Sequence, residues 1–264
     1  MTPPIRHGCA ATLVWAITQV VGSMPAVACE PPMPNVIRLN PFVVQGAATL
    51  SEKDRPLLPR NVDFRIDVLH VDRVDAASFV LRADARLKTD VDIPLPAQAR
   101  GDVVTVHVHA SSPLRAGVGY SVYGVLAGQR QRVFQFQTAA AEDRAAPSSV
   151  QVSKVTHLGN FTPMIGLCDN GHARLLLNIV ASDDSTATDQ LRYEIEGQGE
   201  PQLQAAWCRR LEIALSPSTR TGVVRITAID LAGNRGPTAT VAIPPAVPGS
   251  WETLRRLQTC EPAR

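Results

Sequence analysis

The sequence contains few aromatic residues, and its charges nearly cancel. Aromatic side chains make up 5% of the 264 residues, which argues against a large aromatic platform for binding carbohydrate. The formal net charge is +2 at pH 7, and acidic and basic residues are interspersed without a basic stripe or an acidic tail. The sequence therefore predicts that nucleic acid is not a partner.

The motifs of common enzyme active sites are absent from the sequence. There is no G-x-S-x-G nucleophile segment, no P-loop and no glycine pattern for a dinucleotide. There is also no H-E-x-x-H or C-x-x-C segment, which would supply a zinc site. We therefore expect no catalytic residues and no cofactor, and we expect the protein not to be an enzyme.

Long hydrophobic runs are absent except near the N-terminus. Arg6 and His7 precede an apolar run over 9–21, and the small-residue segment Ala26-Val27-Ala28 follows it. A basic start, a short apolar centre and an A-x-A exit are the three parts of a secretory signal. The pattern predicts a removable signal peptide over 1–28 and export to the periplasm, the cell surface or the extracellular medium.

Cleavage after Ala28 would make Cys29 the first residue of the mature chain. Cys29 could then carry a lipid, which would anchor the protein to the outer membrane. Lipidated sequences usually have leucine three residues before the cysteine, whereas Ala26 stands there in this chain. We therefore favour plain export, and we expect membrane association only if Cys29 is lipidated.

Four cysteines remain after cleavage, an even number that favours disulfides in an oxidising compartment. Cys168 and Cys208 both fall in the C-terminal half, and a bridge between them would close a loop of about 40 residues, worth roughly 3–4 kcal/mol. The second pair, Cys29 and Cys260, would form only if the two ends of the mature chain meet.

Short alternating apolar runs recur along the chain and predict an all-β protein. About seven strands are expected by Thr138, the number found in an immunoglobulin-type sandwich. The runs are 35–44, 62–68, 78–82, 90–95, 104–108, 120–122 and 134–138.

Three of these segments resemble bacterial immunoglobulin-like (Ig-like) domains. Segment 59–66 resembles the entry to their second strand, and segment 131–138 resembles their closing F-x-T strand. Segment 113–122 resembles their L-x-x-G-x-x-Y-x-V segment, in which the tyrosine hydroxyl bonds back to nearby backbone. The resemblance implies an Ig-like β-sandwich over 29–140 and a tyrosine corner at Tyr120.

The remainder predicts a second sandwich. Segment 141–148 resembles the D-x-x-A-P lead of tandem Ig-like or fibronectin type III repeats, and we interpret it as a linker that few contacts cross. Alternating runs then indicate an Ig-like or fibronectin type III-like sandwich over 149–246. In the tail, 247–264, Ser250 is a possible helix cap, and Trp251, Leu254 and Leu257 lie on one face of a short helix.

Segment 228–236 separates two of these runs and resembles the A-x-D-x-A-G-N connection between the last two strands of bacterial Ig-like domains. Asp230 can hydrogen-bond backbone two residues further on, and Gly233 and Asn234 tolerate a positive φ. Asp230 and Asn234 could also hold an ion, but a tight turn explains both.

Two groups of residues are candidates for metal binding. His107 and His109 share one face of a strand, so both could reach one ion, although a third ligand is missing. Asp183, Asp184 and Asp189 crowd one loop and could hold calcium. We favour solvent-facing histidines and a solvated acidic turn, and therefore predict no metal.

These observations predict an exported, non-enzymatic structural, adhesive or protein-binding module. Its partner would be another protein or a surface glycan, neither of which the sequence specifies. The alternatives are a glycan- or calcium-binding module that uses Asp183, Asp184 and Asp189, and a metal-dependent hydrolase that uses His107 and His109.

Overall fold

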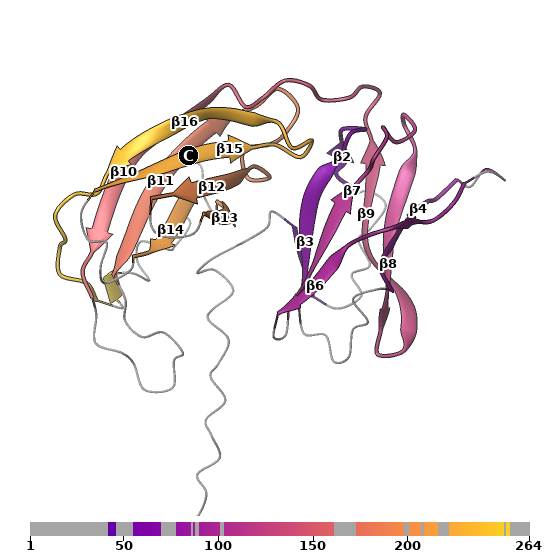
Figure 1. The fold of residues 1–264 in the computed structure, drawn as a ribbon, viewed down its shortest axis with the longest axis horizontal. Helices are drawn as coiled ribbons and strands as arrows, with labels where there is room; N and C mark the ends of the chain where they lie inside the picture. The colour runs from indigo at the N-terminus through magenta and orange to yellow at the C-terminus, as the bar shows by residue number, and fades with distance from the viewer. Residues whose placement is uncertain are drawn as a thin grey trace, which may run out of the picture.

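The computed structural model describes residues 42–45, 55–69, 78–85, 87, 90–100, 103–160, 173–197, 201–206, 209–215, 222–250 and 252–253. Its regular structure is almost entirely β, as the alternating runs predict, and it forms two sandwiches side by side (Figure 1). No helix in this described part is long and apolar enough to cross a membrane.

In its described residues, the first sandwich has nine strands in two sheets. One sheet has the order β1-β3-β7-β6, and the other has the order β2-β9-β8-β4-β5. Strand β1 pairs with β3 in parallel, and β2 pairs with β9 in parallel, while the remaining pairs are antiparallel. The strands are β1 (Phe42–Gln45), β2 (Leu57–Leu58), β3 (Asp63–Leu69), β4 (Val80–Ala83), β5 (Ile93–Pro94), β6 (Ala97–Arg100), β7 (Val103–His109), β8 (Gly119–Leu126) and β9 (Gln129–Thr138).

The core of this sandwich is built from the inward positions of both sheets. Phe64 of β3 meets Phe136 of β9 edge-to-face with 5.9 Å between ring centroids, and Tyr120 of β8 stacks on Phe136 at 5.8 Å. The Tyr120 hydroxyl accepts a hydrogen bond from the backbone N–H of Arg115 at 3.1 Å, which confirms the predicted tyrosine corner. Several of the few aromatic residues therefore lie where the two sheets of this sandwich meet.

The second sandwich has a sheet with the order β10-β11-β14 and a sheet with the order β13-β12-β15-β16. This division into three and four antiparallel strands is that of fibronectin type III-like and constant-type Ig-like domains. The strands are β10 (Ser149–Leu158), β11 (Arg174–Ser182), β12 (Arg192–Glu196), β13 (Gln202–Ala205), β14 (Arg210–Ala214), β15 (Val223–Ile229) and β16 (Arg235–Ala242).

Each sandwich encloses its own hydrophobic core, but one residue of the second contributes to the core of the first. Leu231, in the turn between β15 and β16, is 1% exposed and packs with the buried residues of the first sandwich. The expected linker is also crossed by several hydrogen bonds, so the expectation of few contacts there is wrong. That the two sandwiches fold as separate units remains a prediction.

The strand expectations need two corrections, and the expected tail helix is described only in part. The sequence does not predict strands β2, β6 and β13, because they have no clear period-2 hydrophobic pattern. Such short edge strands form by pairing with a neighbouring strand rather than by burying an apolar face. The run over 90–95 forms only β5. In the tail, Thr253 N donates to Ser250 Oγ at 3.0 Å as a helix cap would, but apart from residues 252 and 253 the expected helix lies outside the described residues.

Candidate functional site at the domain junction

The turn between β15 and β16 is held by one buried carboxylate. Asp230 is fully buried, and its Oδ1 accepts hydrogen bonds from the backbone N–H groups of Ala232 and Asn234, both at 2.8 Å. Its Oδ2 accepts a third bond from Asn234 Nδ2 at 2.8 Å, and Gly233 has a φ of +87°. The turn chemistry predicted for segment 228–236 is therefore present.

This turn is also the part of the second sandwich that contacts the first. The backbone N–H of Asp63, at the start of β3, donates to Leu231 O at 2.7 Å. A Cβ atom at Gly233 would lie 3.1 Å from Asp63 Oδ2, so the turn packs directly against the Asp63 carboxylate. From β12, Arg192 donates from Nη2 to Asp63 O at 2.9 Å. The backbone of Asp63 is thus fixed on both sides by the second sandwich.

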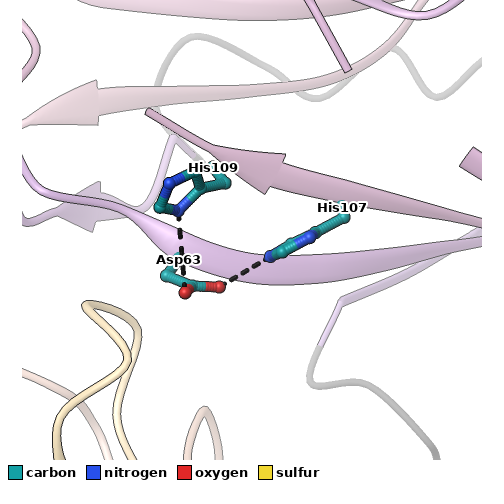
Figure 2. A group of neighbouring side chains, drawn as sticks. All are labelled: Asp63, His107 and His109. Carbon is teal, nitrogen blue, oxygen red and sulfur yellow. Dashed lines mark hydrogen bonds and ion pairs between the residues drawn. The ribbon is translucent and has the colours of Figure 1, made fainter. Parts of the chain in front are cut away.

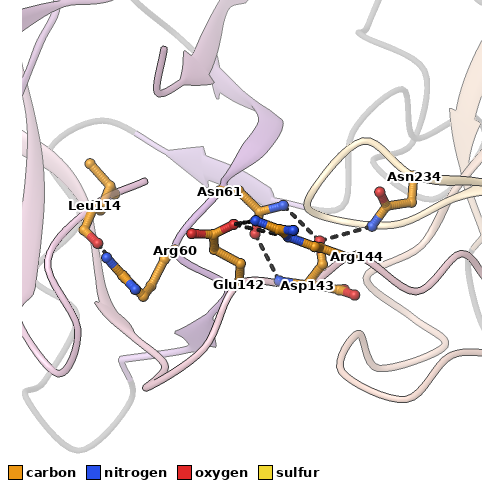
Figure 3. Close-up of polar contacts among 7 residues, drawn as sticks. All are labelled: Arg60, Asn61, Leu114, Glu142, Asp143, Arg144 and Asn234. Carbon is orange, nitrogen blue, oxygen red and sulfur yellow. Dashed lines mark hydrogen bonds and ion pairs between the residues drawn. The ribbon is translucent and has the colours of Figure 1, made fainter. Parts of the chain in front are cut away.

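The linker is fixed at the same place, as Figure 3 shows. Asn61 Oδ1 accepts from the backbone N–H of Asp143 at 2.8 Å, and Asn61 Nδ2 donates to Asp143 O at 2.6 Å. Asn234 Nδ2 reaches across from the turn to Asp143 O at 3.2 Å and to Ala145 O at 3.1 Å. The first sandwich, the linker and the β15–β16 turn therefore meet in one hydrogen-bonded junction.

Three carboxylates converge in this junction. Asp143 from the linker, Asp183 after β11 and Asp230 from the turn each place an oxygen within 4.8 Å of the other two. Burial raises the pKa of Asp230 to about 6, and burial likewise raises the pKa of Asp143. We call these three residues the acidic cluster.

Most oxygens of the acidic cluster already accept hydrogen bonds. Asp143 accepts from Ala145 N at 3.1 Å and from Ser185 Oγ, and Asp183 Oδ2 accepts from Thr186 N at 2.7 Å. Among the oxygens of the three carboxylates, Asp183 Oδ1 is buried without a hydrogen-bond partner. Local turns and linker contacts therefore account for the arrangement of this cluster.

A second group lies on the outer face of the first sandwich, beside the junction (Figure 2). His107 Nε2 lies 2.7 Å from Asp63 Oδ1, and His109 Nδ1 lies 3.6 Å from Asp63 Oδ2. Asp63 is the cross-strand neighbour of His109 in the β3–β7 register. The hydrogen bond from His107 is the main reason that the pKa of Asp63 is lowered. We call Asp63, His107 and His109 the histidine cluster.

The structure brings together only some of the residues that the sequence singled out. His107 and His109 are neighbours, with ring centroids 5.8 Å apart, and the valines at 104, 106 and 108 that alternate with them are buried in the core as expected. Asp183 joins Asp143 and Asp230, whereas the described residues place neither Asp184 nor Asp189 in a ligand group with it. The sequence reasoning missed Asp63 and Asp143, because their partners are more than 30 positions away along the chain.

Several sequence predictions fall outside the described residues. Cys29, Cys168, Cys208 and Cys260 lie there, as does the signal segment 1–28. The Cys168–Cys208 and Cys29–Cys260 pairs, the cleavage after Ala28 and the lipid on Cys29 therefore stay predictions. Peptide mapping of unreduced protein would test both disulfide pairs.

No protein-family model and no curated protein matches this sequence. Among solved structures, the fibronectin(III)-like modules of Clostridium thermocellum CbhA match with 12% identity and a TM-score of 0.28, covering 71% of this chain and 87% of that one. The Ig1-2 module of the Drosophila receptor protein tyrosine phosphatase DLAR matches with 10% identity and a TM-score of 0.31, covering 72% and 94%. A pullulanase from Anoxybacillus sp. LM18-11 matches with 13% identity and a TM-score of 0.24, covering 71% and 25%.

Because these TM-scores are low, the assignment of the fold rests on the strand order and on the residues themselves. The strand order of each sheet, the tyrosine corner at Tyr120 and the β15–β16 turn define a protein of two Ig-like and fibronectin type III-like sandwiches.

Proposed function

We propose that the protein is an exported, non-enzymatic module in which two joined Ig-like sandwiches act as a structural or protein-binding unit. Sandwiches of this class serve mainly as scaffolds whose function depends on surface residues. Export is supported by the sequence pattern over 1–28. The partner is a protein or a surface glycan.

The observation that carries the proposal is the burial of Leu231 in the core of the neighbouring sandwich. Domains that are joined only by a linker move relative to one another by default. Here the β15–β16 turn, the linker and β3 share hydrogen bonds, and these bonds hold the two sandwiches at one angle. A fixed angle suits a spacer or a composite binding surface, since both need the two domains to be presented together.

Two glycines with a similar positive φ provide a matched test of this rigidity. Gly233, with a φ of +87°, faces Asp63, whereas Gly128 in the β8–β9 turn, with a φ of +78°, has no atom within 4 Å of the position that a Cβ would occupy. Gly233→Val should therefore strain its turn and also displace the other sandwich, whereas Gly128→Val should strain only its turn.

Small-angle X-ray scattering on the purified protein distinguishes these outcomes. We expect wild type and Gly128→Val to share one radius of gyration and one maximum dimension, and Gly233→Val to show a broader distance distribution. A wild-type profile that already requires many interdomain angles would contradict the rigid unit.

Export is tested by fractionating a Gram-negative bacterium that expresses the full chain and measuring the intact mass of the product. We expect a soluble periplasmic or secreted form whose first residue is Cys29. A lipid-modified mass in the membrane fraction would support the anchored alternative, and an uncleaved cytoplasmic product would contradict export.

A further inference from the structure

The histidine cluster has the ligand set that the sequence by itself did not supply. His107 and His109 provide two imidazole nitrogens from β7, and β3 places the Asp63 carboxylate between them. One ligand atom from each residue lies within 4.8 Å of the other two. Two imidazoles with one carboxylate form a donor set that suits zinc and related first-row cations.

We propose that Asp63, His107 and His109 form a binding site for a divalent first-row transition-metal ion, with zinc as its occupant. This proposal does not depend on export or on the structural role proposed above. It also concerns binding alone.

The distances support a tetrahedral ion. With zinc bonds of about 2.0–2.1 Å, ligand atoms of a tetrahedral site lie roughly 3.3 Å apart. His107 Nε2 lies 2.7 Å from Asp63 Oδ1 and His109 Nδ1 lies 3.6 Å from Asp63 Oδ2, so each nitrogen is near a different oxygen of the same carboxylate, and the two separations lie on either side of this value. Rotation of the Asp63 and histidine side chains would therefore place one carboxylate oxygen and the two nitrogens, which already lie within 4.8 Å of one another, around a single ion.

Asp63 is positioned before any ion binds. Its backbone N–H donates to Leu231 O at 2.7 Å and its carbonyl accepts from Arg192 at 2.9 Å, so the second sandwich fixes this ligand. The histidine side chains are 35% and 52% exposed, which leaves the ion accessible from solvent. Three protein ligands leave a fourth position for water or for a side chain of a partner.

Nearby positive charge limits the affinity. Arg192 interacts electrostatically with Asp63, and Arg65 is the cross-strand neighbour of His107 and is exposed. Arg65→Gln removes one of these charges without removing a ligand, and we expect it to bind zinc at least as tightly as wild type.

The test is isothermal titration calorimetry of tag-free, full-length protein with zinc chloride in a non-chelating buffer, with magnesium chloride as the comparison. We expect one zinc per chain at the site and no binding of magnesium, which prefers oxygen ligands. His107→Gln and His109→Gln should each weaken zinc binding at least about tenfold, because each removes one of three ligands.

Lys154→Gln serves as the control, because Lys154 is an exposed residue of β10 outside the cluster and its loss changes the charge but no ligand. This variant should bind zinc as wild type does. Circular dichroism melts would show whether each variant is folded, and His109→Gln, at the more exposed position, keeps the test valid if His107→Gln unfolds.

Cobalt substitution provides a second measurement of the same site. Wild-type protein with cobalt should show the visible absorption of a tetrahedral ion, and this band should be lost in His109→Gln. The proposal is overturned if wild type binds no zinc, or if both histidine variants bind zinc within about threefold of wild type, which would place any bound zinc elsewhere.

Discussion

Two clusters of potential ligands lie at the same junction, and they differ in what their polar atoms already contact. In the acidic cluster, the two oxygens of Asp230 accept three hydrogen bonds from its own turn, and Asp143 bonds Ala145 and Ser185. In the histidine cluster, His109 lies 3.6 Å from Asp63 and is half exposed. Among the described residues, the His107 side chain bonds only to Asp63 within the same cluster. Close carboxylates are therefore structural where donors of nearby turns occupy them, whereas a carboxylate whose partners are two partly exposed histidines forms a candidate ion site.

Burial separates the two clusters as well. Asp230 is fully buried, and its pKa is raised to about 6, while Asp63 is one-third exposed and its pKa is lowered by His107. The acidic cluster is therefore coupled to the stability of the junction, and the histidine cluster is open to ligands.

The largest effect is expected from Leu231→Ala, which removes the apolar anchor next to the acidic cluster. Leu231 is 1% exposed in the core of the first sandwich, so the substitution should lower the free energy of unfolding by about 3 kcal/mol. Urea unfolding monitored by circular dichroism measures the loss. The matched control is Leu87→Ala at a 55% exposed leucine, which should change stability by less than about 0.5 kcal/mol.

If Leu231→Ala lowered the free energy of unfolding no more than the Leu87→Ala control does, the turn would not anchor the two sandwiches. Limited proteolysis adds an independent measurement. Cleavage between residues 139 and 149 should be slow in wild type, because Asn61 and Asn234 hold the linker, and faster in Leu231→Ala.

The next effect compares one residue from each cluster. Asp230→Ala should lower the free energy of unfolding by about 2 kcal/mol, because it leaves the backbone N–H groups of Ala232 and Asn234 without their acceptor, partly offset by the removal of a buried charge. His109→Gln should change the free energy of unfolding by less than about 0.5 kcal/mol, because the side chain is 52% exposed. Thermal melts of the metal-free proteins measure both changes in stability. Equal losses of stability would contradict the distinction between a structural acidic cluster and an accessible histidine cluster.

Between pH 7 and pH 5, the contribution of Asp230 to the free energy of unfolding should change by about 1 kcal/mol. Its folded pKa of about 6 lies above the ordinary aspartate value of 3.8, so in this range the folded state takes up a proton that the unfolded state does not. Stability from this group therefore rises as the pH falls. Asn234, Asp143 and Arg192 are the polar and charged groups that act on it.

Asp230→Asn isolates this contribution, since the amide does not titrate. The difference in unfolding free energy between wild type and Asp230→Asn, measured by urea at pH 5 and pH 7, should shift by about 1 kcal/mol in favour of wild type at pH 5. Asp143, whose pKa is raised in the same direction, remains in both proteins. A shift of the opposite sign would contradict a buried, charge-destabilised Asp230.

The smallest effect is expected from calcium. Because local donors occupy most oxygens of the acidic cluster, millimolar calcium should leave the melting temperature unchanged in wild type and in Asp184→Asn. Differential scanning calorimetry measures the shift. A rise that disappears in Asp184→Asn would make the loop that contains Asp183, Asp184 and Asp189 a calcium site and would favour the ligand-binding alternative.

The sequence predicted local features well. The alternation of Val104, Val106 and Val108 placed the intervening histidines on the outer face, because strand residues alternate between faces. The bond of the Tyr120 hydroxyl and the turn at Asp230 were also predictable, since both depend on residues at most five positions apart. Edge strands such as β6 and β13 were missed because their pairing, rather than an apolar pattern, defines them.

Most of the longer strands, the two β-sandwiches and the chemistry of the β15–β16 turn could be predicted from the sequence, because these follow from hydrophobic alternation and short-range hydrogen bonding. Only the tertiary structure decided that Asp63 completes a ligand set with His107 and His109, and that Leu231 belongs to the core of the neighbouring sandwich. Such contacts join residues far apart in the chain. They depend on strand register and on how the two sandwiches pack, which no local pattern encodes.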